Sequence, residues 1–500
     1  MLRSGGADLT IAGGIREFGR ATPAALAVRD GDRALTYAAL DERSSRLANA
    51  LLLLHLKPGD RVALLCGNRL EYPEIAAGIA KAGLVLVPVN PRLTAPEVDF
   101  ILGHSGARVL IADDALAASV PSFTGAVICI GGSSLGLEYE GWIGAAPAKD
   151  PWVAVDERDP FCITYTAGTT GDPKGVLISH RSRCLTFYAT ALEWGLGPGR
   201  RTIAVAPMYH GAGFAFAYAA VYCGATVSML RSFDPHLLLD MIRRERAQSV
   251  FLVPTHAQLI RGAVREVPEL PSLDTLYFNA AALPKVLKEW VFEAFPGVGV
   301  HELYGSTEAG VVTNLRPPDA RRKAGSVGHP WFATQVRVVG PDGQPVGPGE
   351  PGELYSRSPY LMNGYHDNPA ATAVCTTDDG YLTSGDIVVA DDEGFISIVD
   401  RVKDLIITGG VNVYPRDVEE VLLTHSSVVE AAVVGEPDDR WGERVVAYLV
   451  CREAIEATAL DAHLRARLAG YKVPKEFKII AALPRNAAGK VLKRELRSTP

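Results

Sequence analysis

Hydrophobic positions follow two alternating periods along residues 33 to 115. Leu40, Leu47 and Leu51 recur at helical spacing, whereas the next apolar run, 61–65, is short and continuous, which is typical of a buried strand. The pattern then predicts helices at 75–82 and 96–102 and strands at 84–89 and 107–112. This βαβ rhythm favours a largely parallel sheet that is covered by helices.

The same rhythm continues after residue 160. It predicts helices at 180–192, 214–223 and 234–245, and strands at 202–206, 225–230, 249–253 and 276–279. Three segments with polar or glycine-rich character, 207–213, 279–284 and 304–308, directly follow predicted strands. Ligands of open α/β sheets gather at the carboxyl ends of strands, so we expect these segments to contribute to one site.

The pattern of hydrophobic and turn residues changes near residue 333. Short β segments separated by Pro/Gly turns predict an antiparallel subregion, and a small terminal unit follows with helices at 415–423 and 460–468. The predicted class is therefore α/β, with a large N-terminal domain (1–400) of mixed and parallel sheets and a β-rich subregion. A small, mobile α+β C-terminal lid (401–500) completes the expected architecture, with a hinge near Lys403.

Composition narrows the class of protein. Hydrophobic residues make up 48% and charged residues 21%, as in soluble globular proteins, and the net charge of −7 argues against a general nucleic-acid binder. The seven cysteines form no CxxC pair, which gives no zinc or redox spacing. No apolar stretch reaches the roughly 20 residues that span a bilayer, and no signal peptide is recognised, so a cytoplasmic location is expected.

One short stretch, TYTAGTTGDPKG at 164–175, concentrates candidate chemistry. It holds three glycines, four threonines and Lys174 between two apolar, strand-like segments. Such a loop can wrap backbone N–H groups and hydroxyls around a polyphosphate, and Lys174 would hold the outer phosphates. It fails the Walker pattern, because Gly175 stands where the magnesium-binding Ser/Thr should be and Pro173 replaces the preceding glycine.

The stretch resembles the signature loop of the adenylate-forming superfamily, which includes acyl-CoA synthetases, luciferases and peptide-synthetase adenylation domains. Ala167 stands where serine is commoner. Further family motifs follow in order: YGSTE at 304–308, SGD at 384–386, DRVKDLIITGG at 400–410 and PRNAAGK at 484–490. The resemblance covers essentially the whole chain. It implies an AMP-forming, ATP-dependent carboxylic acid:CoA ligase that uses ATP, Mg²⁺ and CoA.

The resemblance also implies a role for each motif residue. Catalysis would involve Lys490, Glu308, Thr307 and His210, with Mg²⁺ held by Glu308. ATP and AMP would be bound by Thr166, Ala167, Gly168, Thr169, Thr170, Gly171, Lys174, Tyr304, Gly305, Asp386 and Arg401. CoA contacts would come from Gly409, Gly410, Trp441, Tyr471 and Lys475, and for the last three ordinary surface packing is an equal alternative. Lys403 would be the pivot of the hinge.

The acyl pocket is expected from His210, Phe214, Asn279, Ala280 and Ala281. Apolar neighbours favour an aliphatic or aryl acid, and no clear cation in these segments marks a dicarboxylate. Asn279 departs from the glycine usual in many relatives. The expected partners are a small carboxylic acid, ATP and CoA, with a homodimer as the candidate assembly. Two alternatives stay open: an enzyme that loads a carrier-protein thiol or stops at the adenylate, and a non-catalytic family member.

Overall fold

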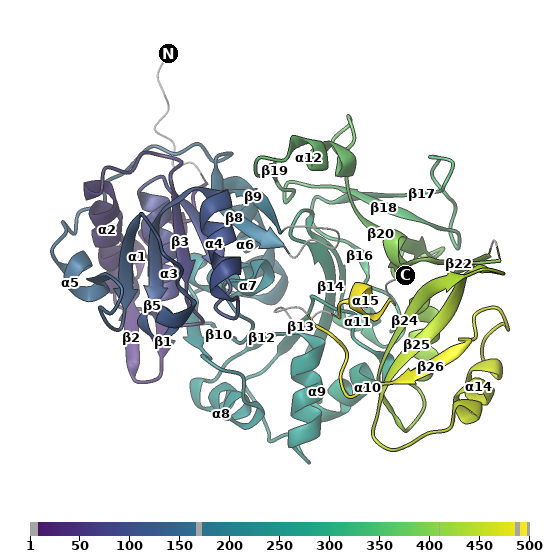
Figure 1. Ribbon diagram of the computed structural model, residues 1–500. Coiled ribbons are helices and arrows are strands. Elements are labelled where there is room, and N and C mark those ends of the chain that lie inside the picture. The colour runs from purple at the N-terminus through teal and green to yellow at the C-terminus, as the bar shows by residue number, and fades with distance from the viewer. Residues whose placement is uncertain (1–8, 167–172, 410, 486–490, 498–500) are drawn as a thin grey trace.

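The computed structural model describes residues 9–166, 173–409, 411–485 and 491–497, apart from the side chain of Val402. Two large sheets with helices between and around them form the body of the molecule (Figure 1). A four-stranded antiparallel sheet and a separate C-terminal sheet lie to one side of this body. Ala167, Gly168, Thr169, Thr170, Gly171, Gly410 and Lys490 lie outside the described residues.

The first large sheet contains the phosphate-loop strands. Its eight strands have the order β19-β9-β8-β4-β3-β5-β6-β7, with β3, β4, β5, β6, β7 and β8 parallel. Their bounds are β3 Arg61–Leu65, β4 Val85–Val89, β5 Ala107–Asp113, β6 Ala126–Ile130, β7 Leu137–Glu138, β8 Pro160–Thr166, β9 Lys174–Ser179 and β19 Gly364–Tyr365. The antiparallel pairing of β8 with β9 brings both ends of the loop to one edge.

The second large sheet has nine strands in the order β16-β15-β14-β13-β12-β10-β11-β1-β2. Their bounds are β1 Leu26–Asp30, β2 Arg33–Thr36, β10 Arg201–Ala204, β11 Thr226–Met229, β12 Ser249–Leu252, β13 Thr275–Phe278, β14 Gly299–Ser306, β15 Gly310–Leu315 and β16 His329–Pro330. The central strands from β14 to β1 are parallel, so their carboxyl ends share one edge.

The helices follow the predicted periodicity closely. They are α1 Gly13–Ala21, α2 Tyr37–Leu53, α3 Glu71–Lys81, α4 Ala95–Ser105, α5 Tyr139–Gly144, α6 His180–Trp194, α7 Gly211–Tyr222, α8 Pro235–Glu245, α9 Pro254–Ala263, α10 Lys285–Ala294, α11 Pro317–Ala320 and α12 Pro369–Cys375. Helix α7 is rich in Ala and Gly and almost wholly buried. Helices α6 and α7 share one core with side chains of both large sheets, which places them between the sheets.

The C-terminal part contains two further sheets, one of four strands and one of five. The strands β17 Gln335–Val339, β18 Pro351–Arg357, β20 Leu382–Ala390 and β21 Ile396–Arg401 form the predicted antiparallel subregion. After the short helix η2 (Val402–Asp404) come β22 Ile406–Thr408, β23 Val411–Val413, α13 Pro415–Leu422, β24 Val428–Asp438, β25 Gly442–Cys451, α14 Ala457–Arg465, β26 Glu476–Ile479 and α15 Lys493–Leu496. Residues 406–477 enclose a separate hydrophobic core.

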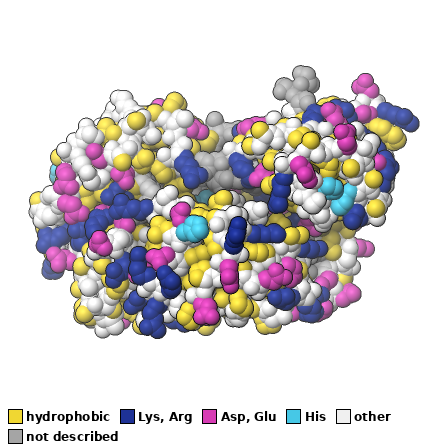
Figure 2. Space-filling view, turned by 90° about the horizontal axis from the view of Figure 1, so that it is seen from below, with side chains coloured by type: hydrophobic (Ala, Val, Ile, Leu, Met, Phe, Trp, Pro, Cys, Tyr) yellow, Lys and Arg dark blue, Asp and Glu magenta, His cyan; other side chains and the backbone are white. Residues whose placement is uncertain are grey.

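The charge distribution of the body is locally balanced. On the face shown in Figure 2, basic side chains gather together with acidic ones. Around β1, β2 and α8 the arginines form ion pairs: Arg29–Glu245, Arg33–Glu71, Arg231–Asp30 and Arg243–Asp240. Within the described ranges, no helix is both long enough and apolar enough to cross a bilayer.

Candidate active site

The phosphate-loop strands place Thr166 and Lys174 opposite each other at the loop-bearing edge of the first sheet. Thr166 Oγ1 donates to the backbone oxygen of Lys174 at 3.5 Å. The hairpin therefore holds Thr166 and Lys174 on paired positions at the two ends of the loop, and their phosphate-binding role stays a prediction. The intervening residues 167–171, to which the sequence assigned most of the phosphate contacts, lie outside the described part of the chain.

A single tyrosine joins the predicted phosphate and metal groups. The Tyr365 hydroxyl donates to Glu308 Oε1 at 3.0 Å, and the Lys174 ammonium lies 5.0 Å from the centre of the Tyr365 ring. Strand β19, which carries Tyr365, pairs with β9 and so fixes this ring beside the loop. Sequence reasoning missed Tyr365, because it lies 57 residues beyond Glu308 and only the β19–β9 pairing brings it to the site.

The predicted reaction centre forms where α7 begins. A Cβ atom on Gly211 would lie 3.8 Å from Thr307 Oγ1 and 4.0 Å from the Thr164 methyl. His210 directly precedes this helix, so its backbone adjoins the place where Gly211 approaches Thr307. The assignment of both residues to the reaction centre stays a prediction. Burial lowers the pKa of His210, which leaves a neutral imidazole near pH 7, able to donate one hydrogen bond and accept another.

A hydrogen-bonded triad forms the predicted nucleoside site. The Tyr304 hydroxyl donates to Asp386 Oδ2 at 2.6 Å, and Arg401 Nε donates to Asp386 Oδ1 at 2.8 Å. Burial raises the pKa of Tyr304 well above its ordinary value, so the phenol stays protonated and keeps donating. Three motifs that lie far apart in the sequence thus converge on one carboxylate.

Glycine is sterically required at position 305. A Cβ atom there would lie 2.0 Å from the Gly310 backbone oxygen, across the β14–β15 hairpin. Beside it, the Ser384 hydroxyl donates to Ser306 Oγ at 2.9 Å and links the second motif to the third. Gly305 therefore permits the tight hairpin that aims Tyr304 and Thr307.

The segment after β13, which the sequence assigned to the acyl pocket, forms a tight local turn. Ala280 adopts a left-handed backbone with φ of 76°, and Asn279 Oδ1 accepts from the Ala280 N–H. Glu302 Oε1 accepts from the Leu283 N–H at 3.3 Å, and Lys288 Nζ lies 2.5 Å from Glu302 Oε2. This buried ion pair anchors the turn and leaves Ala280 and Ala281 exposed.

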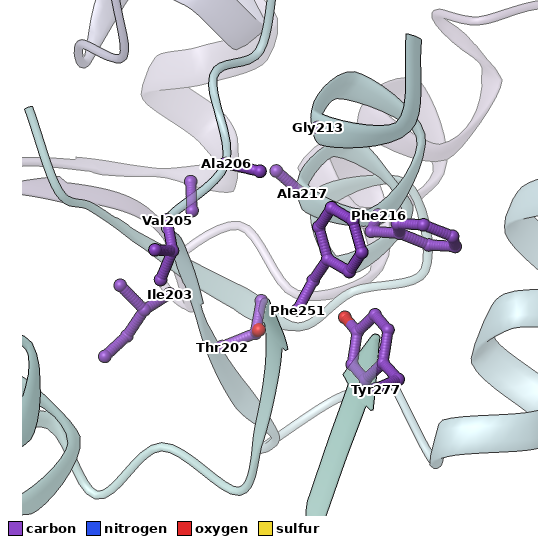
Figure 3. Close-up of a pocket in the computed structure, with 10 residues that line it drawn as sticks. Thr202, Ile203, Val205, Ala206, Gly213, Phe216, Ala217, Phe251 and Tyr277 are labelled. Atoms are coloured by element: carbon purple, nitrogen blue, oxygen red, sulfur yellow. The ribbon is translucent and has the colours of Figure 1, made fainter. Parts of the chain in front are cut away.

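Aromatic side chains fill the space between α7 and the second sheet. A cavity of about 10 Å³ remains there, lined by Phe216, Phe251 and Tyr277 with small residues around it (Figure 3). Since a water molecule needs about 10–15 Å³, this cavity, which we call the aromatic closed end, is too small to hold an acyl group. Phe214, which the sequence assigned to the pocket, stacks on Phe161 and Tyr218 in the core instead.

Of the C-terminal residues predicted to contact CoA, Gly409 and Trp441 lie together. Gly409 has φ of 58°, and a Cβ atom on it would lie 2.9 Å from the Trp441 ring. The Gly409 N–H also donates to the Trp441 backbone oxygen at 2.8 Å. Trp441 and Tyr471 are 42% and 44% exposed, and no ring contact joins them among the described residues. The Lys475 N–H donates to the Val445 backbone oxygen, which fixes the backbone there.

The predicted hinge lies where the antiparallel sheet ends. Strand β21 runs to Arg401, and η2 carries Lys403 directly after it. The Lys403 backbone oxygen accepts from Arg497 at 3.4 Å. The helix α13 is tied back to β21 by Arg416, which donates to the Ile398 backbone oxygen at 2.9 Å.

Comparison with known proteins agrees with this convergence of motifs. The AMP-binding enzyme family model matches residues 15–366, and the model of the AMP-binding enzyme C-terminal domain matches residues 417–490. The chain is a member of the AMP-binding enzyme family. It is 39% identical to a feruloyl-CoA synthase from Amycolatopsis sp. over 484 residues, with 96% of each chain covered.

Other members of this family are similar over the same length. A 2-succinylbenzoate–CoA ligase from Geobacillus kaustophilus is 36% identical, with 95% of each chain covered. The solved o-succinylbenzoate CoA synthetase (MenE) from Bacillus subtilis, in complex with an acyl-adenylate intermediate, has a TM-score of 0.87 and 29% identity, with 98% of each chain covered. The α/β class and the adenylate-forming resemblance predicted from the sequence are confirmed.

Proposed function

We propose that this chain is an AMP-forming acid:CoA ligase, which activates a carboxylic acid as its adenylate and then transfers the acyl group to CoA. The observation that carries the proposal is the joint convergence of Lys174, Tyr365 and Glu308 on one side and of Tyr304, Asp386 and Arg401 on the other. The first group suits a magnesium-bound polyphosphate, and the second suits a nucleoside. Relatives named as CoA ligases support the same reaction.

The first half-reaction is a displacement at phosphorus. A carboxylate oxygen of the acid attacks the α-phosphorus of ATP, the α–β bridging bond breaks, and pyrophosphate leaves with its electron pair. Positioning and charge neutralisation dominate such reactions. We assign Thr307 and His210 to the reaction centre and Lys174 to the outer phosphates, while Asp386 and Arg401 orient the ribose.

Magnesium fits the residues that surround the phosphates. The Glu308 carboxylate offers the hard oxygen that Mg²⁺ prefers, and Tyr365 holds that carboxylate in place through its hydroxyl. Among the described residues, no cluster of three or more His, Cys, Asp or Glu could hold a metal alone. Phosphate oxygens of ATP would therefore complete the coordination. Bound there, the ion would neutralise charge on the phosphates.

The second half-reaction uses an external thiol. The CoA sulfur attacks the acyl carbon, the C–O bond to the phosphate breaks, and AMP leaves. Burial raises the pKa of the Cys66, Cys162 and Cys184 thiols, so these side chains are poor nucleophiles. We propose that Lys490 serves adenylation, that Gly409 and Gly410 line the pantetheine path, and that rotation about Lys403, at the boundary of domains 1–400 and 401–500, exchanges the two.

The acid is proposed to have a hydrophobic aliphatic or aryl body. The apolar lining formed by Phe216, Phe251 and Tyr277 supports this, because Tyr277 lies on β13, the strand that leads into Asn279, Ala280 and Ala281. Apolar burial contributes about 25 cal/mol per Å² to binding of such a group.

The test is ATP–pyrophosphate exchange with a panel of aliphatic and aryl acids, followed by product analysis with CoA. The proposal expects acid-dependent exchange, and then equal amounts of AMP and acyl-CoA. Exchange without CoA turnover, restored by an acyl-carrier protein, would instead assign a carrier-protein ligase. No exchange with any acid would assign a non-catalytic member. A homodimer and a cytoplasmic location remain part of the proposal, and light scattering and cell fractionation test them.

A further inference from the structure

One interior arginine has no hydrogen-bond or ion-pair partner among the residues that the structure describes. Arg183, in the first turn of α6, is 9% exposed, yet it makes no hydrogen bond or ion pair with any residue that the structure describes, and its Nε is buried without an acceptor. Arg69 shows the usual arrangement: it is 8% exposed and pairs with both Glu71 and Asp113. Arg183 is therefore an exception among the buried cations.

An isolated buried guanidinium is costly. Arginine stays protonated in proteins, so Arg183 cannot escape the cost by losing its charge, as a lysine could. Buried charges are normally paired, because desolvation is repaid only by an opposite charge and by hydrogen bonds to every N–H. A fold that keeps such a group unpaired leaves an anion-binding position to be completed by a ligand.

The neighbours of Arg183 connect it to the reaction centre. Its charge acts on the Cys162 thiol, and the Cys162 sulfur lies 3.6 Å from Thr164 Oγ1. The Thr164 methyl and Thr307 Oγ1 in turn lie 4.0 Å and 3.8 Å from the position that a Cβ atom on Gly211 would take. Cys162 and Thr164 are two residues apart on β8, a spacing of about 6.6 Å, so this strand connects the surroundings of Arg183 to the place where we propose that the adenylate forms.

Further unsatisfied polar groups follow the same stripe of α6. Thr190 and Trp194 lie seven and eleven residues after Arg183, which puts all three on one helix face. Thr190 Oγ1 and Trp194 Nε1 are also buried, and neither has a hydrogen-bond partner within the described part of the chain. The Trp194 ring stacks on Tyr277 with centroids 4.4 Å apart, and Tyr277 lines the aromatic closed end. These three unpaired hydrogen-bond donors therefore lie along one face of α6, and the last of them packs against Tyr277.

We propose that Arg183 is the specificity residue for a second carboxylate on the acid substrate, so that the preferred substrate is a hydrophobic acid carrying a further anionic group. This inference rests on the proposed ligase function and names its substrate class. One carboxylate is activated beside Thr307, while the other pairs with the Arg183 guanidinium. A dicarboxylate was not expected from the sequence, because Arg183 lies in α6, outside the segments assigned to the pocket.

The test compares matched acids in ATP–pyrophosphate exchange with the full chain. Each pair differs by one distal carboxylate: hexanoate with adipate, and phenylacetate with 4-carboxyphenylacetate. A hydrogen bond to a charged group contributes about 1.5–3 kcal/mol, so the wild type should favour at least one diacid over its partner by about ten- to hundredfold in kcat/KM. Arg183→Leu should remove or reverse that ratio, and Arg183→Lys should retain part of it.

Arg181→Leu is the matched control, since Arg181 lies two residues away on α6 but is exposed and paired with Glu157. For Arg181→Leu, the ratio of kcat/KM for the diacid to that for the monoacid should equal the wild-type ratio. Thermal melting verifies folding, and Arg183→Leu should melt no lower than the wild type because an unpaired buried charge has been removed. A merely structural Arg183 would instead lower the melting temperature and reduce exchange equally with both acids of a pair.

Two results would overturn the inference. If the wild type exchanges with the monoacids at least as well as with the diacids, and Arg183→Leu leaves the ratio unchanged, Arg183 does not read a second carboxylate, although the ligase function stands. If no acid of either set supports exchange, the ligase function itself fails, and the substrate class fails with it.

Discussion

Asp400 offers a quantitative test of the junction between the body and the C-terminal part. Its side chain is nearly buried, at 6% exposed. Oδ1 accepts from the Arg401 N–H at 2.7 Å, and Oδ2 accepts from the Arg416 N–H at 3.1 Å, which ties α13 to the end of β21. Burial raises the pKa of Asp400 to about 6, against the lowering effect of Lys493 and these two amides.

The raised pKa of Asp400 means that its ionisation destabilises the folded protein. The folded protein binds the proton more tightly than the unfolded chain, so Asp400 costs nothing below its ordinary pKa of 3.8. The cost grows as the pH rises from 3.8 to about 6 and is constant above that. The difference between the two pKa values corresponds to about 3 kcal/mol at the plateau.

Asp400→Asn removes the charge and keeps one carbonyl acceptor. The loss of the second acceptor costs about 1 kcal/mol, so the variant should be more stable than the wild type by about 2 kcal/mol at pH 8. Below about pH 4 the wild-type carboxyl is protonated and its titration cost is gone, so only the lost acceptor remains and the variant should be less stable by about 1 kcal/mol. Urea unfolding of both proteins between pH 4 and 8 measures this difference directly.

The exposed Asp392, substituted by Asn in the same way, is the control and should show no such pH-dependent difference. A difference between wild type and Asp400→Asn that stays constant from pH 4 to 8 would refute the reasoning, because a buried carboxyl with a raised pKa must titrate within that window.

Three further substitutions test the site. Tyr365→Phe removes the hydroxyl that holds Glu308, and the Mg²⁺ concentration for half-maximal exchange should rise about tenfold, or about 1.4 kcal/mol; an unchanged magnesium titration would contradict the contact. Phe251→Ala should shift the preferred acid to a longer chain at a stability cost of about 3–5 kcal/mol, which an acid series and thermal melting check; an unaltered preference would remove Phe251 from the pocket wall. Lys490→Ala should abolish adenylation yet spare thioester formation from supplied acyl-AMP, and equal loss of both half-reactions in separate assays would refute its role.

Features that depend on neighbours in the sequence could be predicted, whereas features that depend on long-range packing could not. The strand at 61–65 and helix α6 were predictable, because periodicity and turn residues are local signals. The environment of each α7 ring was not, since the packing of α7 between two sheets places Phe214 in one core and Phe216 in another.

Long-range pairing set the remaining features of the site. Tyr365 reaches Glu308 only because β19 pairs with β9, and this two-residue strand has no pattern of its own. Arg183 resembles any helical arginine in the sequence, and only the packing around α6 shows that it has no partner among the described residues. The motif residues, in contrast, could be named in advance because their local spacing is distinctive.

The central claim is attack of the acid's carboxylate on the α-phosphorus of ATP, and an oxygen label tests it most directly. An acid that supports exchange, labelled with ¹⁸O in its carboxylate, is turned over with ATP and CoA, and the products are analysed by mass spectrometry. The proposed reaction places one ¹⁸O atom of each turned-over acid in AMP. Label in orthophosphate together with ADP, or unlabelled AMP alongside acyl-CoA, would contradict it.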